Sequence, residues 1–491
     1  MTGALARGLD EVELAAEVRR ALGVVATGAA AVLAVSGGRD SAGLALLVAR
    51  ARGDLVLTVA HVRHGLRDDD ADAAAAAAVA QHLGLPITVR AVAVRRGGEG
   101  IEAAARDARH AALAAVARDC GAHAVLLGHT ADDQAETVLL ALGRGTGVRG
   151  LGGMRQVRDG DGVQILRPML RLRRADVAAV AAGLPTVDDP TNADPDQRRR
   201  RVRTAVLPAL AGLSGGSGDP VALLTRLADL ARDDADLLDE LAADHVRRLV
   251  RAWGPVRVVR AEALGGLHPA LRRRVARALL ADVRGATAGL PATAVDRVLA
   301  LALAEPAAPA GPARAGAARA GGAGEVQVTG GMRVTANGGW LAAAPPDLAD
   351  LPARPLAVPG AVDLPELGLR LTAVLAGSAA AASARGSPPG QDVLPPRARQ
   401  PRGTAAASVV ALGPVALLGL VVRARRAGDR APGSSRSLGR RLTDLGVPRA
   451  LRALVPVVAT WAGEPLWVPG VAVAPADVLQ TAVVVRLERL R

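Results

Sequence analysis

Short apolar runs alternate with amphipathic stretches over about residues 30–130 of the chain. Four runs rich in Val, Leu and Ala are typical of buried strands, and they cover 30–35, 55–62, 87–94 and 123–129. The stretches between them repeat apolar positions at helical spacing and predict helices over 41–51, 70–84 and 101–121. This alternation indicates a doubly wound parallel α/β sheet, in which ligands bind beyond the carboxyl ends of the strands.

The pattern changes after residue 212. Leucines recur at helical spacing over 223–249, and 268–280 and 291–303 continue the pattern, before a small hairpin over 326–344. We expect four parts: an α/β domain over 1–212, a mostly helical domain over 213–345, a low-complexity linker region over 346–406 and a small mixed α+β domain over 407–491. The low-complexity stretches 305–325 and 376–406 are expected to be mobile.

The composition excludes several kinds of chemistry. The chain has 491 residues and 61 basic residues, all of which are arginine. Without lysine it can form neither a Walker A loop, nor a protein-kinase site, nor a Schiff base. Its single cysteine, Cys120, excludes an internal disulfide, a Cys-x-x-Cys pair and a thiolate zinc site.

The net charge of +14 favours a polyanionic partner, although GC-rich coding also raises the arginine content. The first residues carry acids where a signal peptide would have its apolar core. The longest uncharged run, Gly403 to Val422, contains Pro414 and is better interpreted as a linker leading into a buried strand than as a membrane span. We therefore expect a soluble, cytoplasmic protein with no membrane partner.

A small-residue turn follows the first predicted strand, with the sequence Ser36-Gly37-Gly38-Arg39-Asp40-Ser41. Two glycines let backbone N–H groups approach an anion closely, and the start of the following helix favours the same charge. Asp40 would repel a phosphate unless a divalent cation lies between them, which points to Mg²⁺. The alternative is a tight strand-to-helix turn without a ligand.

Further polar residues follow the other predicted strands. His61, His64 and His129 come at strand ends and would share one crevice with Ser36. Asp132, Asp133 and Glu136 lie within one helical turn just after the fourth strand, so they repel one another unless they bind a metal or cationic groups. A solvated helix start with a favourable dipole is the other interpretation of this cluster.

The turn resembles the pyrophosphate-binding loop of the N-type ATP pyrophosphatases, the PP-loop superfamily. The string GHTADDQAETVLLALGRGTGVRGLGGM (128–154) is similar to the signature of the tRNA(Ile)-lysidine synthase family. Other segments match that family in the same order, namely 61–67, 101–110, 165–177, 188–210, 421–430 and 440–470. The resemblance is dense over residues 30–210 and thin through the helical part.

This resemblance implies an ATP- and Mg²⁺-dependent ligase that joins free L-lysine to C2 of the wobble cytidine in a minor isoleucine tRNA with a CAU anticodon. The reaction would pass through an adenylated cytidine and release AMP and pyrophosphate, giving lysidine. By position in the motifs, Ser36, Gly37, Gly38, Arg39, Asp40 and Ser41 would bind ATP, with Asp40 on the metal; Asp133 and Glu136 would organise metal or the lysine ammonium; Arg109, Arg201 and Arg203 would counter phosphate charge; and His61, His64 and His129 would line the nucleotide crevice. Backbone-bonded strand-end roles remain the alternative for His61 and His64.

Three positions depart from the family pattern: Arg63 stands where Asp is usual, His110 where Tyr is usual, and Arg200 where Asn is usual. Arg63 and Arg200 favour a catalytically silent RNA-binding homologue as one alternative. Two further alternatives, a tRNA thiolase and an amidating ligase, share the same loop. A thiolase usually needs a pair of cysteines, and an amidating ligase needs an ammonia source, for which no cysteine nucleophile is present. The oligomeric state, a homodimer included, and the tRNA identity elements stay open.

Overall fold

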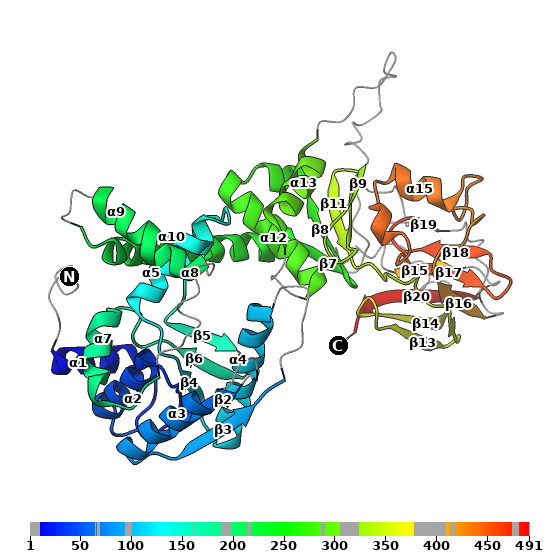
Figure 1. Ribbon diagram of the computed structural model, residues 1–491. Helices are drawn as coiled ribbons and strands as arrows, with labels where there is room; N and C mark the ends of the chain where they lie inside the picture. The colour runs from blue at the N-terminus through cyan, green and yellow to red at the C-terminus, as the bar shows by residue number, and fades with distance from the viewer. Residues whose placement is uncertain are drawn as a thin grey trace. The chain divides into compact units, whose positions relative to one another are not determined.

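The structure, a computed structural model, describes residues 10–63, 65, 69–93, 101–160, 162–187, 198–213, 218–285, 290–304, 324–377, 409–412, 416, 419–473 and 481–490. The chain divides into two compact units, Met1–Asp236 (unit 1) and Leu237–Arg491 (unit 2) (Figure 1). Among the described helices, none is both long and apolar enough to cross a membrane.

Unit 1 contains the α/β sheet that the sequence predicts. Its strand order is β3-β2-β1-β4-β6-β5. Five strands are parallel: β1 (Ala30–Ala34), β2 (Val56–Arg63), β3 (Ile87–Ala91), β4 (Ala124–Leu126) and β6 (Val163–Leu166). The sixth strand, β5 (Val157–Gly160), pairs antiparallel with β6 at the sheet edge, and the sequence analysis missed both β5 and β6.

Both faces of the central strands β1 and β4 are buried, which explains why these two strands are apolar throughout rather than alternating. Leu33 of β1 packs in a core with α1 (Glu11–Ala21), α2 (Arg39–Ala51), α3 (Asp70–Leu83) and α7 (Arg174–Val180). Its neighbour Val32 points to the other face and packs in a core with α4 (Ile101–Asp119). The helices cover the two faces of the sheet, and polar segments follow the carboxyl ends of β1 and β4.

A third small core lies next to the end of β4. In this core α5 (Ala131–Leu142) packs against α10 (Pro220–Leu249) and against an arginine-rich segment. That segment consists of α8 (Arg198–Arg201), the π-helix η4 (Val202–Val206) and α9 (Leu207–Leu213). Val202 and Leu207 contribute the apolar side chains of that segment. The short helices α6 (Val148–Leu151) and η2 (Ala181–Gly183) complete unit 1. This packing brings the arginine-rich segment onto α5.

The region expected to be mostly helical also contains a five-stranded antiparallel sheet, with the order β7-β8-β11-β10-β9. The strands are β7 (Arg251–Trp253), β8 (Val256–Arg260), β9 (Gly324–Gln327), β10 (Arg333–Asn337) and β11 (Trp340–Ala344). One face packs against α11 (Ala261–Gly265), α12 (Pro269–Arg284) and α13 (Ala292–Leu303). The hairpin expected over 326–344 covers β10, β11 and the end of β9, whereas the sequence analysis missed β7 and β8.

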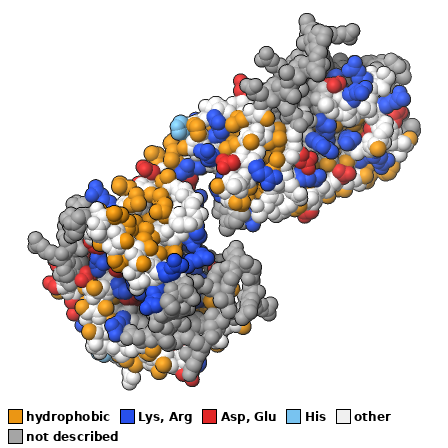
Figure 2. Space-filling model, turned by 45° about the horizontal axis from the view of Figure 1, so that its top comes forward, with side chains coloured by type: hydrophobic (Ala, Val, Ile, Leu, Met, Phe, Trp, Pro, Cys, Tyr) orange, Lys and Arg blue, Asp and Glu red, His pale blue; other side chains and the backbone are white. Residues whose placement is uncertain are grey.

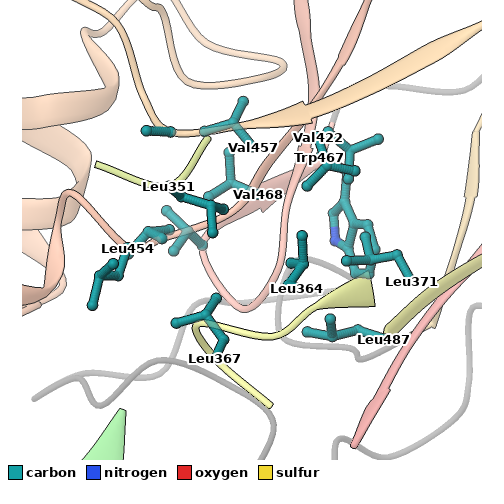
Figure 3. Close-up of a cluster of buried hydrophobic side chains, with 14 of the residues drawn as sticks. Leu351, Leu364, Leu367, Leu371, Val422, Leu454, Val457, Trp467, Val468 and Leu487 are labelled. Atoms are coloured by element: carbon teal, nitrogen blue, oxygen red, sulfur yellow. The ribbon is translucent and has the colours of Figure 1, made fainter. Parts of the chain in front are cut away.

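The other face of that sheet shares a core with two C-terminal antiparallel sheets. One has the order β12-β16-β17-β18-β19, with β12 (Arg354–Leu356), β16 (Leu420–Arg423), β17 (Val457–Thr460), β18 (Pro465–Val468) and β19 (Ala472–Val473). The second has the order β13-β14-β20-β15, with β13 (Gly360–Leu364), β14 (Leu369–Gly377), β20 (Thr481–Arg489) and β15 (Val409–Leu412). Figure 3 shows Trp467 among leucines and valines of this core, beside which lie α15 (Leu438–Asp444) and η8 (Arg449–Leu451).

The expectation of a linker over 346–406 is wrong for 354–377. These residues form β12, β13 and β14, and β14 pairs along its whole length with β20. The sequence signal was weak because β12 contains Pro355 and β13 alternates only partly. The low-complexity stretches lie almost entirely outside the described residues, which omit 305–323 and 378–408.

Candidate active site

The loop between β1 and α2 is a compact turn held by its own serines. The Ser36 backbone N–H donates to Ser41 Oγ over 3.1 Å, and Ser41 Oγ donates to the Gly38 carbonyl over 2.8 Å. Gly37 has φ +95°, and a Cβ there would lie 2.8 Å from the backbone of Asp72, so this position requires glycine. Ser36 and Arg39 are exposed, and Arg39, Asp40 and Ser41 are the first residues of α2.

The acidic residues after β4 occupy the first turns of α5. Thr130 caps that helix in a capping box, in which the Thr130 backbone N–H donates to Asp133 Oδ2 over 2.8 Å. Glu136 follows one turn later and is 1% exposed. Asp132, Asp133 and Glu136 thus start from one helix end, as the sequence predicts.

Arg174, the first residue of α7, joins this acidic turn to the PP-loop-like turn. Its guanidinium donates to Asp40 Oδ2 over 3.1 Å, to Asp133 Oδ1 over 2.5 Å and to Glu136 Oε1 over 3.2 Å. Three carboxylates from two helices therefore converge on one side chain. The cationic groups that the acidic cluster was expected to need are arginines of the chain itself.

Two more arginines neutralise the same cluster. Arg173 donates to both oxygens of Asp132, over 3.3 and 3.2 Å, and pairs with Asp219. Arg203, in the π-helix, donates from Nε to Glu136 Oε1 over 2.9 Å. Arg203 thus contacts the acidic cluster, whereas Arg201 lies in α8 with an exposed side chain.

The electrostatics of the cluster differ between its members. Burial, together with the charges of Asp133 and Asp132, raises the pKa of Asp40, although Arg174 opposes the shift. Burial acts to lower the pKa of Arg174, but the carboxylates outweigh it and raise that pKa. Glu136 Oε2 is buried without a hydrogen-bond partner among the described residues. The cluster therefore keeps an acceptor for a further cation.

The predicted histidines are placed differently from one another. His61 is buried, and its Nδ1 lies 2.9 Å from the Val35 carbonyl, which is the backbone contact considered as the alternative; its Nε2 has no partner in the described part of the chain. His129 Nδ1 is likewise buried and without a partner among the residues described. Burial first, and then the charges of Arg167, Arg106 and Arg109, lower the pKa of His129 although Asp133 opposes them. His64 lies outside the described residues.

Arg109 projects from α4 into a basic neighbourhood. The surrounding protein and the guanidinium groups of Arg106 and Arg199 lower the pKa of Arg109. Arg167, which donates to the Arg155 carbonyl over 2.9 Å, has its pKa lowered to about 10 by burial and by nearby arginines. Burial and these arginines also lower the pKa of His110 to about 4. Like charges gathered in this way favour an anion.

The charge of Arg63, which departs from the family pattern, is compensated locally. Arg63 Nε donates to Asp69 Oδ1 over 2.8 Å, and its guanidinium also pairs with Asp70 at the start of α3. The reversed charge is therefore balanced by acids that follow it in the sequence.

Arg173 and Arg174 are the site residues that sequence reasoning missed. In the structure these two arginines stand at the start of α7, where the helix dipole disfavours positive charge. Positive charge at this helix start is favourable only when carboxylates lie close to it. Asp132 provides one, accepting the Arg174 backbone N–H over 2.7 Å.

Two regions of the chain match the models of known protein families. Residues 11–210 match the model of the PP-loop domain, and residues 420–486 match that of the TilS substrate C-terminal domain. Unit 1 accordingly contains a PP-loop domain.

The chain belongs to the tRNA(Ile)-lysidine synthase family. It is 45% identical over 252 residues to the tRNA(Ile)-lysidine synthase of Streptomyces coelicolor, covering 50% of this chain and 70% of that protein. With the synthase of Mycolicibacterium paratuberculosis the identity is 45% over 262 residues, covering 52% and 76%. With that of Leifsonia xyli it is 42% over 261 residues, covering 52% and 76%. The family resemblance seen in the motifs is thereby confirmed.

Proposed function

We propose that this protein ligates free L-lysine to C2 of the wobble cytidine of a minor isoleucine tRNA with a CAU anticodon. In this reaction the O2 oxygen of cytidine attacks the α-phosphorus of ATP and pyrophosphate leaves. The lysine amine then attacks C2 and AMP leaves with the former O2 oxygen, giving lysidine. The observation that carries the proposal is the convergence of Asp40, Asp133 and Glu136 beyond the carboxyl ends of β1 and β4, the central strands of the sheet.

The turn from Ser36 to Ser41 holds the pyrophosphate portion of ATP. Gly37 lets the backbone approach the anion, and the dipole of the 13-residue helix α2 adds attraction. Arg39, an exposed residue of this turn, adds positive charge. His61 and His129 line the nucleotide crevice. His61 Nε2 and His129 Nδ1 are buried and have no hydrogen-bond partner among the described residues, so each can bond to a ligand. We propose the same place for His64.

Asp40 is the candidate ligand for Mg²⁺. In protein sites Mg²⁺ takes one or two carboxylates and completes its octahedron with phosphate oxygens and water. A carboxylate at the start of the phosphate-binding helix fits that donor set, and the described residues contain no cage of three or more ligands that would suggest another metal. When bound, Mg²⁺ would neutralise phosphate charge.

Asp133 and Glu136 receive the lysine substrate. Glu136 Oε2 is a buried acceptor without a partner among the described residues, which suits an ammonium group. The ammonium must lose a proton before its nitrogen can attack, and a carboxylate at hydrogen-bond distance can take it. Arg174 holds Asp133 and Glu136 in place and keeps their charges from separating them.

Arg109, Arg201 and Arg203 counter negative charge on the adenylate and on the anticodon phosphates. Arg109 lies in a group of arginines, and Arg201 is exposed on the segment that packs on α5. Arg203 spans the two parts of the site, because its guanidinium already reaches Glu136. The tRNA body contacts the region that matches the substrate C-terminal domain.

AMP release from ATP tests this function. We expect AMP only when the minor isoleucine tRNA and lysine are both present. Serine in place of lysine, and a reaction without tRNA, are the controls. Sulfur- or ammonia-dependent turnover would show another PP-loop enzyme, and tRNA binding without AMP would show a silent homologue; either result contradicts the proposal.

A further inference from the structure

The protein exposes one aromatic side chain. The sequence has four tryptophans and no phenylalanine or tyrosine. Trp253 and Trp340 are each 4% exposed and Trp467 is 0% exposed, whereas Trp461 is 64% exposed. Burying an indole is strongly favourable, so an indole left in solvent is an unusual feature in a protein with so few aromatics.

The turn between β17 and β18 holds Trp461 in a defined position. The Gly463 N–H donates to the Thr460 carbonyl and the Thr460 N–H to the Glu464 carbonyl, each over 2.9 Å. One edge of the indole lies against Gly419, where φ is +102° and a Cβ would lie 2.2 Å from the indole Nε1. The missing side chain at Gly419 makes room for the ring, which is therefore supported on one side and open to solvent elsewhere.

The surroundings of Trp461 are basic. Residues 419–473 contain nine arginines and three acids, which gives a net charge of +6. Arg423 is buried, pairs with Asp429 and donates to the Gly463 carbonyl over 2.7 Å, so that it fixes the turn. Arg426 is exposed, and its Nη1 lies 3.7 Å from the position that a Cβ of Gly463 would take. Figure 2 shows arginine side chains at many places on the surface of unit 2.

We propose that Trp461 stacks on an unpaired base of the tRNA substrate, while Arg426 binds a neighbouring phosphate. The inference rests on the proposed function for the identity of the RNA. Stacking on an aromatic ring is favourable for any base, and an adjoining guanidinium supplies the phosphate contact that single-stranded RNA requires. A docking site for an apolar protein partner would not need positive charge beside the ring.

Binding of tRNA to the full chain, measured without ATP or lysine over a series of salt concentrations, tests this contact. Trp461→Ala should weaken binding about 5- to 20-fold with no change in the salt dependence, because stacking releases no counterions. Trp461→Phe is the matched control and should recover most of the affinity, since it restores a ring. Arg426→Ala should weaken binding and reduce the salt slope by about one.

Fluorescence gives a second readout. Bound tRNA should quench the emission of Trp461, and the quenching should be absent in Trp461→Phe because the other three indoles are buried. Wild-type affinity in Trp461→Ala at every salt concentration, or an equal loss in the Ala and Phe variants, would overturn the stacking contact. If the wild-type chain binds tRNA with quenching but forms no AMP, the proposed function fails and the contact stands.

Discussion

Replacing Arg174 by methionine removes the cation on which three carboxylates converge. The carboxylate side chains range from 1% exposed for Glu136 to 30% for Asp40, so they are only partly screened by water. Breaking a fully buried ion pair costs about 3–5 kcal/mol, and an exposed pair contributes about 0–1 kcal/mol. Since Glu136 keeps its contact with Arg203, we expect unit 1 to lose about 2–4 kcal/mol of stability.

Calorimetry of the full chain measures this loss. A loss of that size should lower the melting temperature of unit 1 by about 5–15 °C. All four tryptophans lie in unit 2, so the transition followed by tryptophan fluorescence should not move. Arg171→Met is the matched control: Arg171 is 63% exposed, pairs with Asp229 over 3.4 Å and should lose at most about 1 kcal/mol.

The stability difference between Arg174→Met and the wild-type protein should also depend on pH. Arg174 acts to lower the pKa of Asp40, which burial already raises, so without Arg174 that pKa rises further. The folded variant then binds more protons than its unfolded chain and gains stability as the pH falls. The difference between variant and wild type should therefore narrow from pH 7 toward pH 5. A variant as stable as the Arg171→Met control, or a difference that widens in acid, would refute this reasoning.

Three further outcomes are expected. His110 has its pKa lowered to about 4, below the unfolded value of about 6.5, so unit 1 should lose about 1–2 kcal/mol between pH 7 and pH 5, and calorimetry of His110→Gln should show a smaller loss. Arg423→Ala breaks a buried pair with Asp429 and should destabilise unit 2 by about 3–5 kcal/mol in urea unfolding followed by tryptophan fluorescence, whereas Arg370→Ala, in an exposed pair, should cost at most about 1 kcal/mol. Asp40→Asn should reduce AMP formation at least about 100-fold, yet calorimetry should show unit 1 no less stable, because burial and neighbouring acids raise the pKa of Asp40.

Strong periodic segments made the first domain predictable from the sequence. The strands β1 to β4 and the helices between them follow apolar runs long enough to show their period, and the Ser36–Ser41 turn and the acidic turn after β4 follow from motif spacing. The edge strand β5 carries two charged residues in four, and β12 contains a proline, so neither showed a strand pattern.

Long-range ion pairs could not be predicted in the same way. Arg174 and Asp40 are separated by 134 residues, and only the packing of α7 beside α2 brings their side chains together. The sequence showed that the acidic cluster needed cations, and it could not show which arginines supply them. Arg63 and Asp69 are only six residues apart in the sequence, but no pattern there marked them as partners.

The transfer of one oxygen atom tests the proposed chemistry most directly. A minor isoleucine tRNA carrying ¹⁸O at O2 of the wobble cytidine would be incubated with the full chain, ATP, Mg²⁺ and lysine, and the products examined by mass spectrometry. Attack of that oxygen on the α-phosphorus predicts ¹⁸O in AMP and a wobble nucleoside enlarged by lysine. Label retained in the RNA, or ADP and orthophosphate as the products, would contradict the account.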